Sequence, residues 1–168
     1  MKKNNTETHY NQLLDIVQSR LMLEKRLLTK SNIDIRDKQG RNALYWTIKT
    51  SHKHNTNLLV KYGISFMVTP EKHALFHTIR YKNVDFFTYL LELGENINMI
   101  NEQQQSLLMV AIEEKNIMMI RYLLAHGIHL QLKDKQRKTA LDYAKASNNQ
   151  MIFDLIHYKL LLQEIKKR

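Results

Sequence analysis

The chain has 168 residues, of which 43% are apolar and 25% are charged, and its formal net charge is +10. This length is sufficient for one domain with a buried core. The absence of cysteine excludes disulfide bonds and thiolate chemistry. No apolar run approaches the roughly 18 residues of a membrane-spanning helix, and polar residues follow Met1, so we expect a cytoplasmic protein. Delivery to a host cell by a route that needs no signal stays open.

The first segment, residues 6–36, ends in a variant of a phrase that recurs further along the chain. Its form here is Leu27-Leu28-Thr29-Lys30-Ser31, whereas the later copies close on glycine. We interpret this segment as a degenerate N-terminal capping unit. A terminal unit of a repeat array needs an outer face that is compatible with water.

Three further units repeat the phrase with a glycine at its end. Gly63, Gly94 and Gly127 close these copies, at spacings of 31 and 33 residues. A leucine stands nineteen residues before each glycine, and Leu141 continues the series into a last unit. A period near 33 is typical of a stacked solenoid, whose units are too small to bury their own apolar faces. The predicted repeats are 37–67, 68–100, 101–133 and 134–168.

Each repeat is predicted to hold two short helices, because apolar residues recur at i, i+3 and i+4. Asn42, Ser106 and Thr139 stand where a side chain can cap the first helix, and His73 is a poorer cap in the equivalent place. Asparagines 33 residues apart mark the break between the two helices. Asparagine tolerates the left-handed conformation, so we expect it to replace glycine there. These positions are Asn83, Asn116 and Asn149.

The phrases resemble the ankyrin repeat family. Residues 37–44 match its extended opening with Asp and Gly, and residues 138–144 match the form often seen in a closing repeat. The resemblance covers residues 32–160 and implies an all-α ankyrin-repeat solenoid of about four helix-turn-helix repeats, with a longer final helix from Gln150. The Pro and His of the family's Thr-Pro-Leu-His phrase are absent. We expect apolar packing by Tyr45, Phe76 and Met109 in their place, with Met118 and Met119 also in the core.

Ankyrin proteins usually bind partners through the finger tips and the inner face of each first helix, and the resemblance carries these places over residue by residue. The predicted partner-binding residues are Lys38, Gln39, Arg41, Lys49, Lys72, Arg80, Tyr81, Glu102, Gln103, Gln105, Glu113, Glu114, Lys135, Gln136 and Lys138. Along the chain this surface is basic, basic, acidic and basic. Such alternation favours one register with a protein partner that presents acidic patches to the basic units. The alternative is that these are ordinary solvated charges.

Motifs that carry chemistry are scarce, and we predict no enzyme, no cofactor and no small-molecule substrate. His73 and His77 have a spacing that two metal ligands can share, but no third ligand stands at a fixed offset, so we predict no metal site. Glu113 and Glu114 are adjacent on a helix and point about 100° apart. Trp46 and Tyr45 are expected to seal the first repeat rather than to stack on a base.

The predicted function is therefore to bind a protein, as a monomer when unbound, and to block it in the manner of an inhibitor or immunity protein. A host-directed effector or adaptor is the alternative within the same class. The alternative from another class is a nucleic-acid or anionic-surface binder that uses the basic end units. Its residues are Lys133, Lys135, Arg137, Lys138 and the Lys166-Lys167-Arg168 end.

Overall fold

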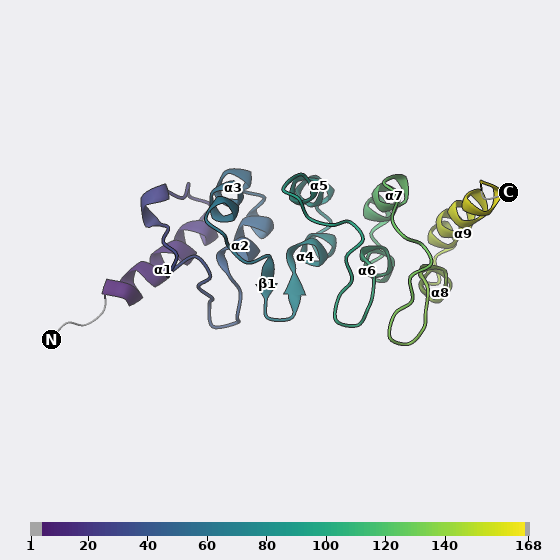
Figure 1. Ribbon diagram of the computed structural model, residues 1–168, viewed down its shortest axis with the longest axis horizontal. Coiled ribbons are helices and arrows are strands. Elements are labelled where there is room, and N and C mark those ends of the chain that lie inside the picture. The colour runs from purple at the N-terminus through teal and green to yellow at the C-terminus, as the bar shows by residue number, and fades with distance from the viewer. Residues whose placement is uncertain (1–4, 167–168) are drawn as a thin grey trace. The chain divides into compact units, whose positions relative to one another are not determined.

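The computed structural model describes the backbone of residues 5–166 and the side chains of residues 12–166. The chain divides into two compact units, residues 1–77 and 78–168, with the boundary inside helix α4 (Ala74–Arg80). Figure 1 labels the elements of both units. The interpretation of 1–168 as a single domain stays a prediction, and Lys167 and Arg168 of the basic end lie outside the described residues.

The first unit begins with helix α1 (Asn5–Gln18), followed by a 3-10 helix, η1 (Lys25–Leu27). Leu13 and Val17 of α1 are buried. The segment between α1 and η1 is held by the buried side chain of Asn55, which accepts a hydrogen bond from Leu23 N and donates one to Leu21 O, both at 2.8 Å. A 3-10 turn in place of a second helix agrees with a degenerate leading unit.

The rest of the first unit is a helix pair followed by a short hairpin. The pair is α2 (Ala43–Thr50) and α3 (Lys53–Lys61), and the antiparallel hairpin is β1 (Met67–Thr69) and β2 (Lys72–His73). The predicted extended fingers are confirmed by this hairpin and by isolated bridges between Arg36 and Asn42 in the first unit and between Ile100 and Ser106 in the second. The hairpin adds a small sheet to an otherwise helical fold.

In the second unit, helices α6 and α8 form one row, and α5, α7 and α9 form the other (Figure 1). Their bounds are α5 (Val84–Glu92), α6 (Leu107–Glu113), α7 (Ile117–Ala125), α8 (Ala140–Ala146) and α9 (Gln150–Ile165). The apolar positions at helical spacing fill the core between the rows, and Leu108, Ile112, Ile120 and Ile156 are fully buried. Helix α9 has 16 residues, which confirms the longer final helix. Among the described residues, every helix is too short or too polar to cross a membrane.

The predicted caps of the first helices are confirmed. Asn42, Ser106 and Thr139 each accept a hydrogen bond from the backbone N–H three residues ahead. His73 also serves as an acceptor, with Nδ1 3.2 Å from Leu75 N. Burial lowers the pKa of His73 to about 4, so its imidazole stays neutral and keeps a ring nitrogen free to accept near neutral pH.

The prediction that Asn83, Asn116 and Asn149 take the left-handed conformation between the helices is wrong. Asn83, Asn116 and Asn149 have negative φ angles and instead cap the second helix. The residue before each of them is left-handed, and these residues are Lys82, Lys115 and Asn148, with Ser51 in the first repeat. The turn needs positive φ at the end of one helix and an acceptor at the start of the next, and asparagine supplies the acceptor.

Two of the core predictions also need correction. Met109 and Met119 are buried, but the Met118 side chain is 68% exposed. Adjacent helix residues point about 100° apart, so Met118 and Met119 cannot both face the core. Tyr45 and Trp46 are half-buried on α2 rather than sealed inside the repeat.

We expect Asn116→Ala to lower the free energy of unfolding by about 2 kcal/mol and Asn149→Ala by about 1 kcal/mol. Both lose a cap, at Met119 N and Ile152 N. Asn116 is buried and also donates to Ile79 O at 3.0 Å, a second hydrogen bond that Asn149 lacks. Urea denaturation measures both losses, and equal losses would contradict the assignment.

Candidate binding surface

Three fingers share one hydrogen-bond arrangement at their base. Asp37, Asn101 and Asp134 each accept hydrogen bonds with Oδ1 from the backbone N–H groups two and four residues ahead, at 2.8–3.0 Å. The backbone carbonyl of each base residue accepts a further bond, of 2.9 Å, from the third residue ahead. These bonds close each finger into a tight turn that presents its first two tip residues outward.

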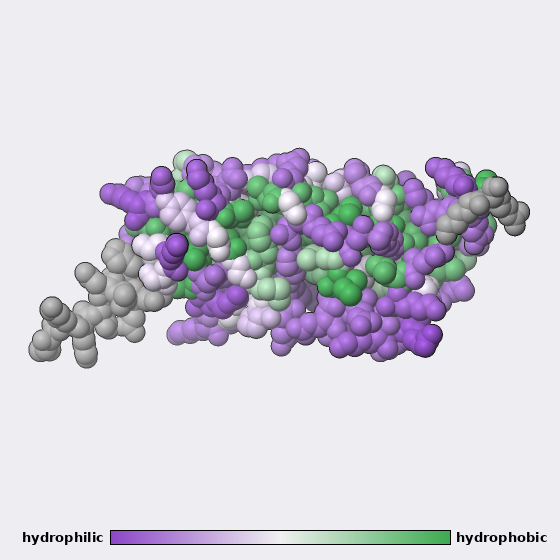
Figure 2. Space-filling model, viewed as in Figure 1, coloured by the Kyte–Doolittle hydropathy of each residue, from purple (hydrophilic) through white to green (hydrophobic). Residues whose placement is uncertain are grey.

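The third tip residue of each of these fingers is left-handed. Its φ angle is 73° at Gly40, 59° at Gln104 and 63° at Arg137. The tip residues before it are exposed in all three fingers. They are the predicted residues Lys38, Gln39, Glu102, Gln103, Lys135 and Gln136. Figure 2 shows hydrophilic surface over the fingers that precede α6 and α8.

The remaining finger is the β1–β2 hairpin, and it differs from the other three. Thr69 pairs with Lys72, so Pro70 and Glu71 form the tip. Lys72 is half-buried on a strand rather than exposed at a tip. Lys72 therefore belongs to this finger, as predicted, but it does not stand at the tip of the hairpin.

In the second unit, the fingers before α6 and α8 and the two helices enclose a cleft of about 780 Å³. The neighbouring fingers are joined by a hydrogen bond of 3.0 Å from Lys135 N to Gln103 O. The cleft brings together six predicted residues that are separate in the sequence, namely Gln103, Gln105, Glu113, Lys135, Gln136 and Lys138.

A chain of side-chain hydrogen bonds forms one wall of this cleft. The side-chain amide of Gln105 donates to Glu113 Oε2 at 3.0 Å and to the Tyr143 hydroxyl at 2.9 Å. That hydroxyl donates to Asp134 Oδ2 at 2.6 Å. Asn101 Nδ2 donates to Gln105 Oε1 at 2.7 Å, so the oxygen and both N–H groups of the Gln105 amide have partners. A network with these bonds satisfied holds its side chains in one geometry.

The network changes the acid–base behaviour of its members. The hydrogen bond from Tyr143 and those from the backbone hold the pKa of Asp134 below its ordinary value. Burial and the bond to Asp134 raise the pKa of Tyr143 to about 12. Burial also raises the pKa of Glu113, and the hydrogen bond from Gln105 and the nearby charge of Lys138 oppose that rise only in part.

Three lysines and three carboxylates line the cleft. Lys115, Lys135 and Lys138 line it, and none of them forms an ion pair with another described residue. The carboxylate of Asp134 is held inside its finger, and that of Asp142 accepts hydrogen bonds from Thr139 N and Oγ1. Of these three carboxylates, that of Glu113 therefore accepts the fewest hydrogen bonds.

Other predicted residues of the second unit lie outside this cleft. Arg80 and Glu114 pair with each other, with 3.4 Å between Arg80 Nε and Glu114 Oε1, so part of their charge is already compensated. Tyr81 follows α4 and its side chain is 39% exposed.

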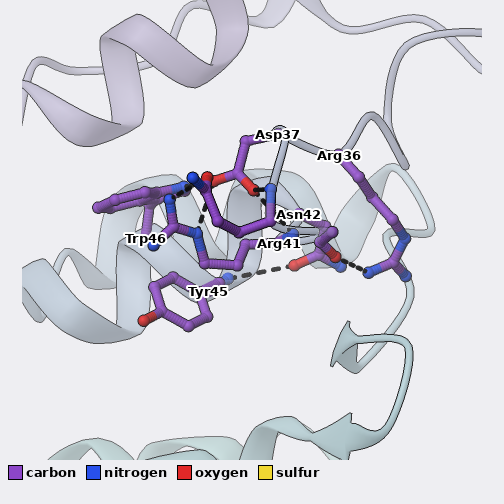
Figure 3. A network of polar contacts seen from close by, with 8 residues as sticks. Arg36, Asp37, Arg41, Asn42, Tyr45 and Trp46 are labelled. Atoms are coloured by element: carbon purple, nitrogen blue, oxygen red, sulfur yellow. Dashed lines mark hydrogen bonds and ion pairs between the residues drawn. The ribbon is translucent and has the colours of Figure 1, made fainter.

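The first unit holds a second cluster, which we call the Trp46 platform and define as Asp37, Arg41, Tyr45, Trp46 and Lys49. Figure 3 shows the first four of these residues, and Lys49 lies beside the Trp46 ring. Asp37 Oδ2 accepts from Arg41 Nε at 2.6 Å and from Trp46 Nε1 at 3.2 Å. Burial tends to raise the pKa of Asp37, but the hydrogen bonds from Arg41 and Gln39 outweigh it and lower the pKa. Arg41 is half-buried and Lys49 is exposed, and both belong to this cluster. Their role in binding a partner stays a prediction.

Tyr143 was not among the predicted site residues, and Trp46 was predicted only to seal the first repeat. Each is an aromatic residue nine positions after the acidic residue at a finger base, and each bonds to that carboxylate. That spacing was the available signal. The third finger has Val110 at this position, and there Gln105 donates to Tyr143 instead.

His73 and His77 lie in different surroundings. His77 is buried against the Tyr45 ring, with 4.3 Å between ring centroids, and His73 is half-buried. Within the part of the chain that the structure describes, no group of three or more His, Asp or Glu side chains is placed to hold a metal ion.

The chain matches a model from a known protein family. The model of ankyrin repeats in three copies matches residues 10–101 and again residues 75–165. No curated protein matches the chain significantly.

We expect Tyr143→Phe to lower the free energy of unfolding by about 1 kcal/mol near neutral pH, because solvent screens part of the lost hydrogen bond. The pKa of Tyr143 rises from 10.0 to about 12 on folding. The contribution of its hydroxyl is therefore complete below pH 10 and is lost between pH 10 and about pH 12. Urea denaturation at about pH 8 and about pH 11 measures this, with the exposed Tyr158→Phe as control. An effect of Tyr143→Phe that is equal at both pH values would contradict the geometry.

Proposed function

The chain belongs to the ankyrin repeat family, and from that premise we propose that it binds an acidic segment of a partner protein in the cleft of the second unit and thereby blocks that partner. Ankyrin repeats indicate a protein–protein interaction module, and the family is generally non-catalytic. The blocking role, as an inhibitor or immunity protein, is the finer part of the proposal. A host-directed effector that occupies its target has the same physical basis.

The observation that carries the proposal is the cleft itself. Its wall is held by the chain of bonds from Asn101 through Gln105 and Tyr143 to Asp134, so the side chains need little ordering when a partner binds. Its rim carries Lys115, Lys135 and Lys138 without ion pairs among the described residues. The carboxylates of Asp134 and Asp142 also line the cleft but already accept hydrogen bonds within the finger and the cap of α8. The lysines are therefore the charged groups that can form new close ion pairs, and they suit a carboxylate-rich segment.

The size of the electrostatic effect sets what the lysines can do. One exposed ion pair contributes only about 0–1 kcal/mol, so no single lysine decides the affinity. Several lysines on a fixed wall act together, steer the acidic partner during encounter and set its register. Glu113, on the same wall, would repel a carboxylate placed beside it and so restricts where the acidic side chains can lie.

The nucleic-acid alternative is favoured by one observation in the last finger. Lys133, Lys135, Arg137 and Lys138 all lie within six residues, and all four are exposed. A binder of that kind loses affinity linearly with the logarithm of salt concentration, irrespective of sequence. An acidic protein segment that also makes apolar contacts retains part of its affinity at moderate salt.

We expect the double reversal Lys135→Glu with Lys138→Glu to weaken partner binding by about tenfold or more, because it places carboxylates opposite carboxylates. Nuclease-treated lysate provides the partner by affinity capture, and a titration with the purified partner gives the Kd. If that partner is an enzyme, a stoichiometric amount of this protein should lower its activity.

The matched control reverses Lys82 and Arg121, which are exposed in the same unit but do not line the cleft. This control makes the same change in net charge and should alter the Kd by less than about twofold. If both double variants weaken partner binding equally, the change in net charge explains the effect. That result would contradict a specific role of the cleft. Recovery of nucleic acid alone in a parallel capture from lysate without nuclease would favour the alternative.

A further inference from the structure

The Trp46 platform of the first unit has an aromatic surface that is held in place although it is half-exposed. Trp46 Nε1 donates to Asp37, and the Arg41 guanidinium lies 4.4 Å from the Trp46 ring centroid. Lys49 Nζ lies 5.0 Å from the same ring. The ring therefore has a fixed orientation and two cations beside it, which is the composition of residues that contribute most to protein interfaces.

The charge around this platform is not balanced within the first unit. Asp37 compensates Arg41, but Arg36 donates to the backbone carbonyls of Gly40 and Met67, at 2.8 and 2.9 Å, and not to a carboxylate. Lys38 and Lys49 are exposed and form no ion pair with another described residue. Asp15 of α1 lines a neighbouring cleft of about 470 Å³ with Arg36 and Lys38, and it balances one of these cations at most.

The platform repeats the construction of the cleft wall in the second unit. In both, a carboxylate at the finger base accepts two backbone N–H groups and one aromatic donor nine residues ahead, and a basic residue stands four residues ahead. The fingers read Asp-Lys-Gln-Gly-Arg and Asp-Lys-Gln-Arg-Lys. The shared construction and a net positive charge on both fingers predict the same class of ligand at both places.

We propose that the Trp46 platform is a second anchor for an acidic segment of the partner protein. This inference rests on the proposed function. Carboxylates of the segment pair with Lys38 and Lys49, and its aliphatic carbon atoms pack on the exposed part of Trp46. A nucleobase fits less well, because Arg41 already lies over the ring and a stacked base would displace it from Asp37. A protein that presents two acidic segments can then gain affinity from both contacts.

The platform can be observed directly, because Trp46 is the only tryptophan in the chain. The probe is a short peptide of alternating Ala and Glu that carries a fluorescein label, and its control has Gln in place of Glu. We expect the acidic peptide to change the fluorescence of Trp46 in a saturable manner and the Gln peptide to leave it unchanged. Anisotropy of the label reports peptide binding anywhere on the protein.

Lys49→Gln should weaken the binding that Trp46 reports by about two- to fivefold, the effect of one exposed ion pair. The matched control is Lys61→Gln, because Lys61 is an exposed lysine of α3 in the same unit. Circular dichroism checks the fold of each variant. If Lys49→Gln is poorly folded, Lys38→Gln at the finger tip should give the same weakening.

The outcomes separate this inference from the proposed function. Anisotropy can detect peptide binding that the double variant Lys135→Glu with Lys138→Glu removes. If that binding leaves Trp46 fluorescence unchanged, the second anchor is overturned and the proposed binding in the cleft stands. Failure of both signals would overturn both proposals. A thymidine oligonucleotide that changes Trp46 fluorescence at lower concentration than the acidic peptide would overturn the anchor in favour of nucleic acid.

Discussion

One side-chain oxygen at the base of each of three fingers accepts two backbone N–H groups, and the surface available to a partner depends on these bonds. These bonds fix each base side chain so that its second polar atom reaches another partner. Asp37 Oδ2 accepts from Arg41 and Trp46, Asn101 Nδ2 donates to Gln105, and Asp134 Oδ2 accepts from Tyr143. The finger and the first helix of its repeat therefore form one rigid surface. Without these bonds the turn would be free to open, and ordering it would cost conformational entropy on binding.

The rows of helices supply the support for that surface. Each second helix begins with a side-chain cap and packs its apolar residues against the first helices of its own unit. The polar network of the cleft and the Trp46 platform are both built on the opposite side of the first helices, at positions that the core does not use. This division lets the core keep its repeating pattern while the exposed positions vary in charge and size from one repeat to the next.

The sequence predicted those features that depend on local spacing. The helix pairs and the caps at Asn42, Ser106 and Thr139 follow from residues within one turn of each other. The period of the repeats follows from the regular spacing of the glycines that close them. The left-handed residue was predicted one position too late. Lys115 and Asn116 stand in the same turn, where Lys115 takes the positive φ and Asn116 caps the next helix. The bonds from Trp46 and Tyr143 to their finger bases join two elements, and no periodicity reveals such contacts. Among the predicted site residues, spacing indicated which of them face outward but not that Arg80 and Glu114 pair with each other.

The central claim is that a partner protein covers the fingers and the first helices. Hydrogen–deuterium exchange of the protein, alone and with its captured partner, tests this most directly because it follows each segment separately. The account predicts slower exchange in residues 101–105 and 134–138 when the partner is bound, with α5, α7 and α9 unchanged. Protection confined to α5, α7 and α9, with both fingers unchanged, would contradict it.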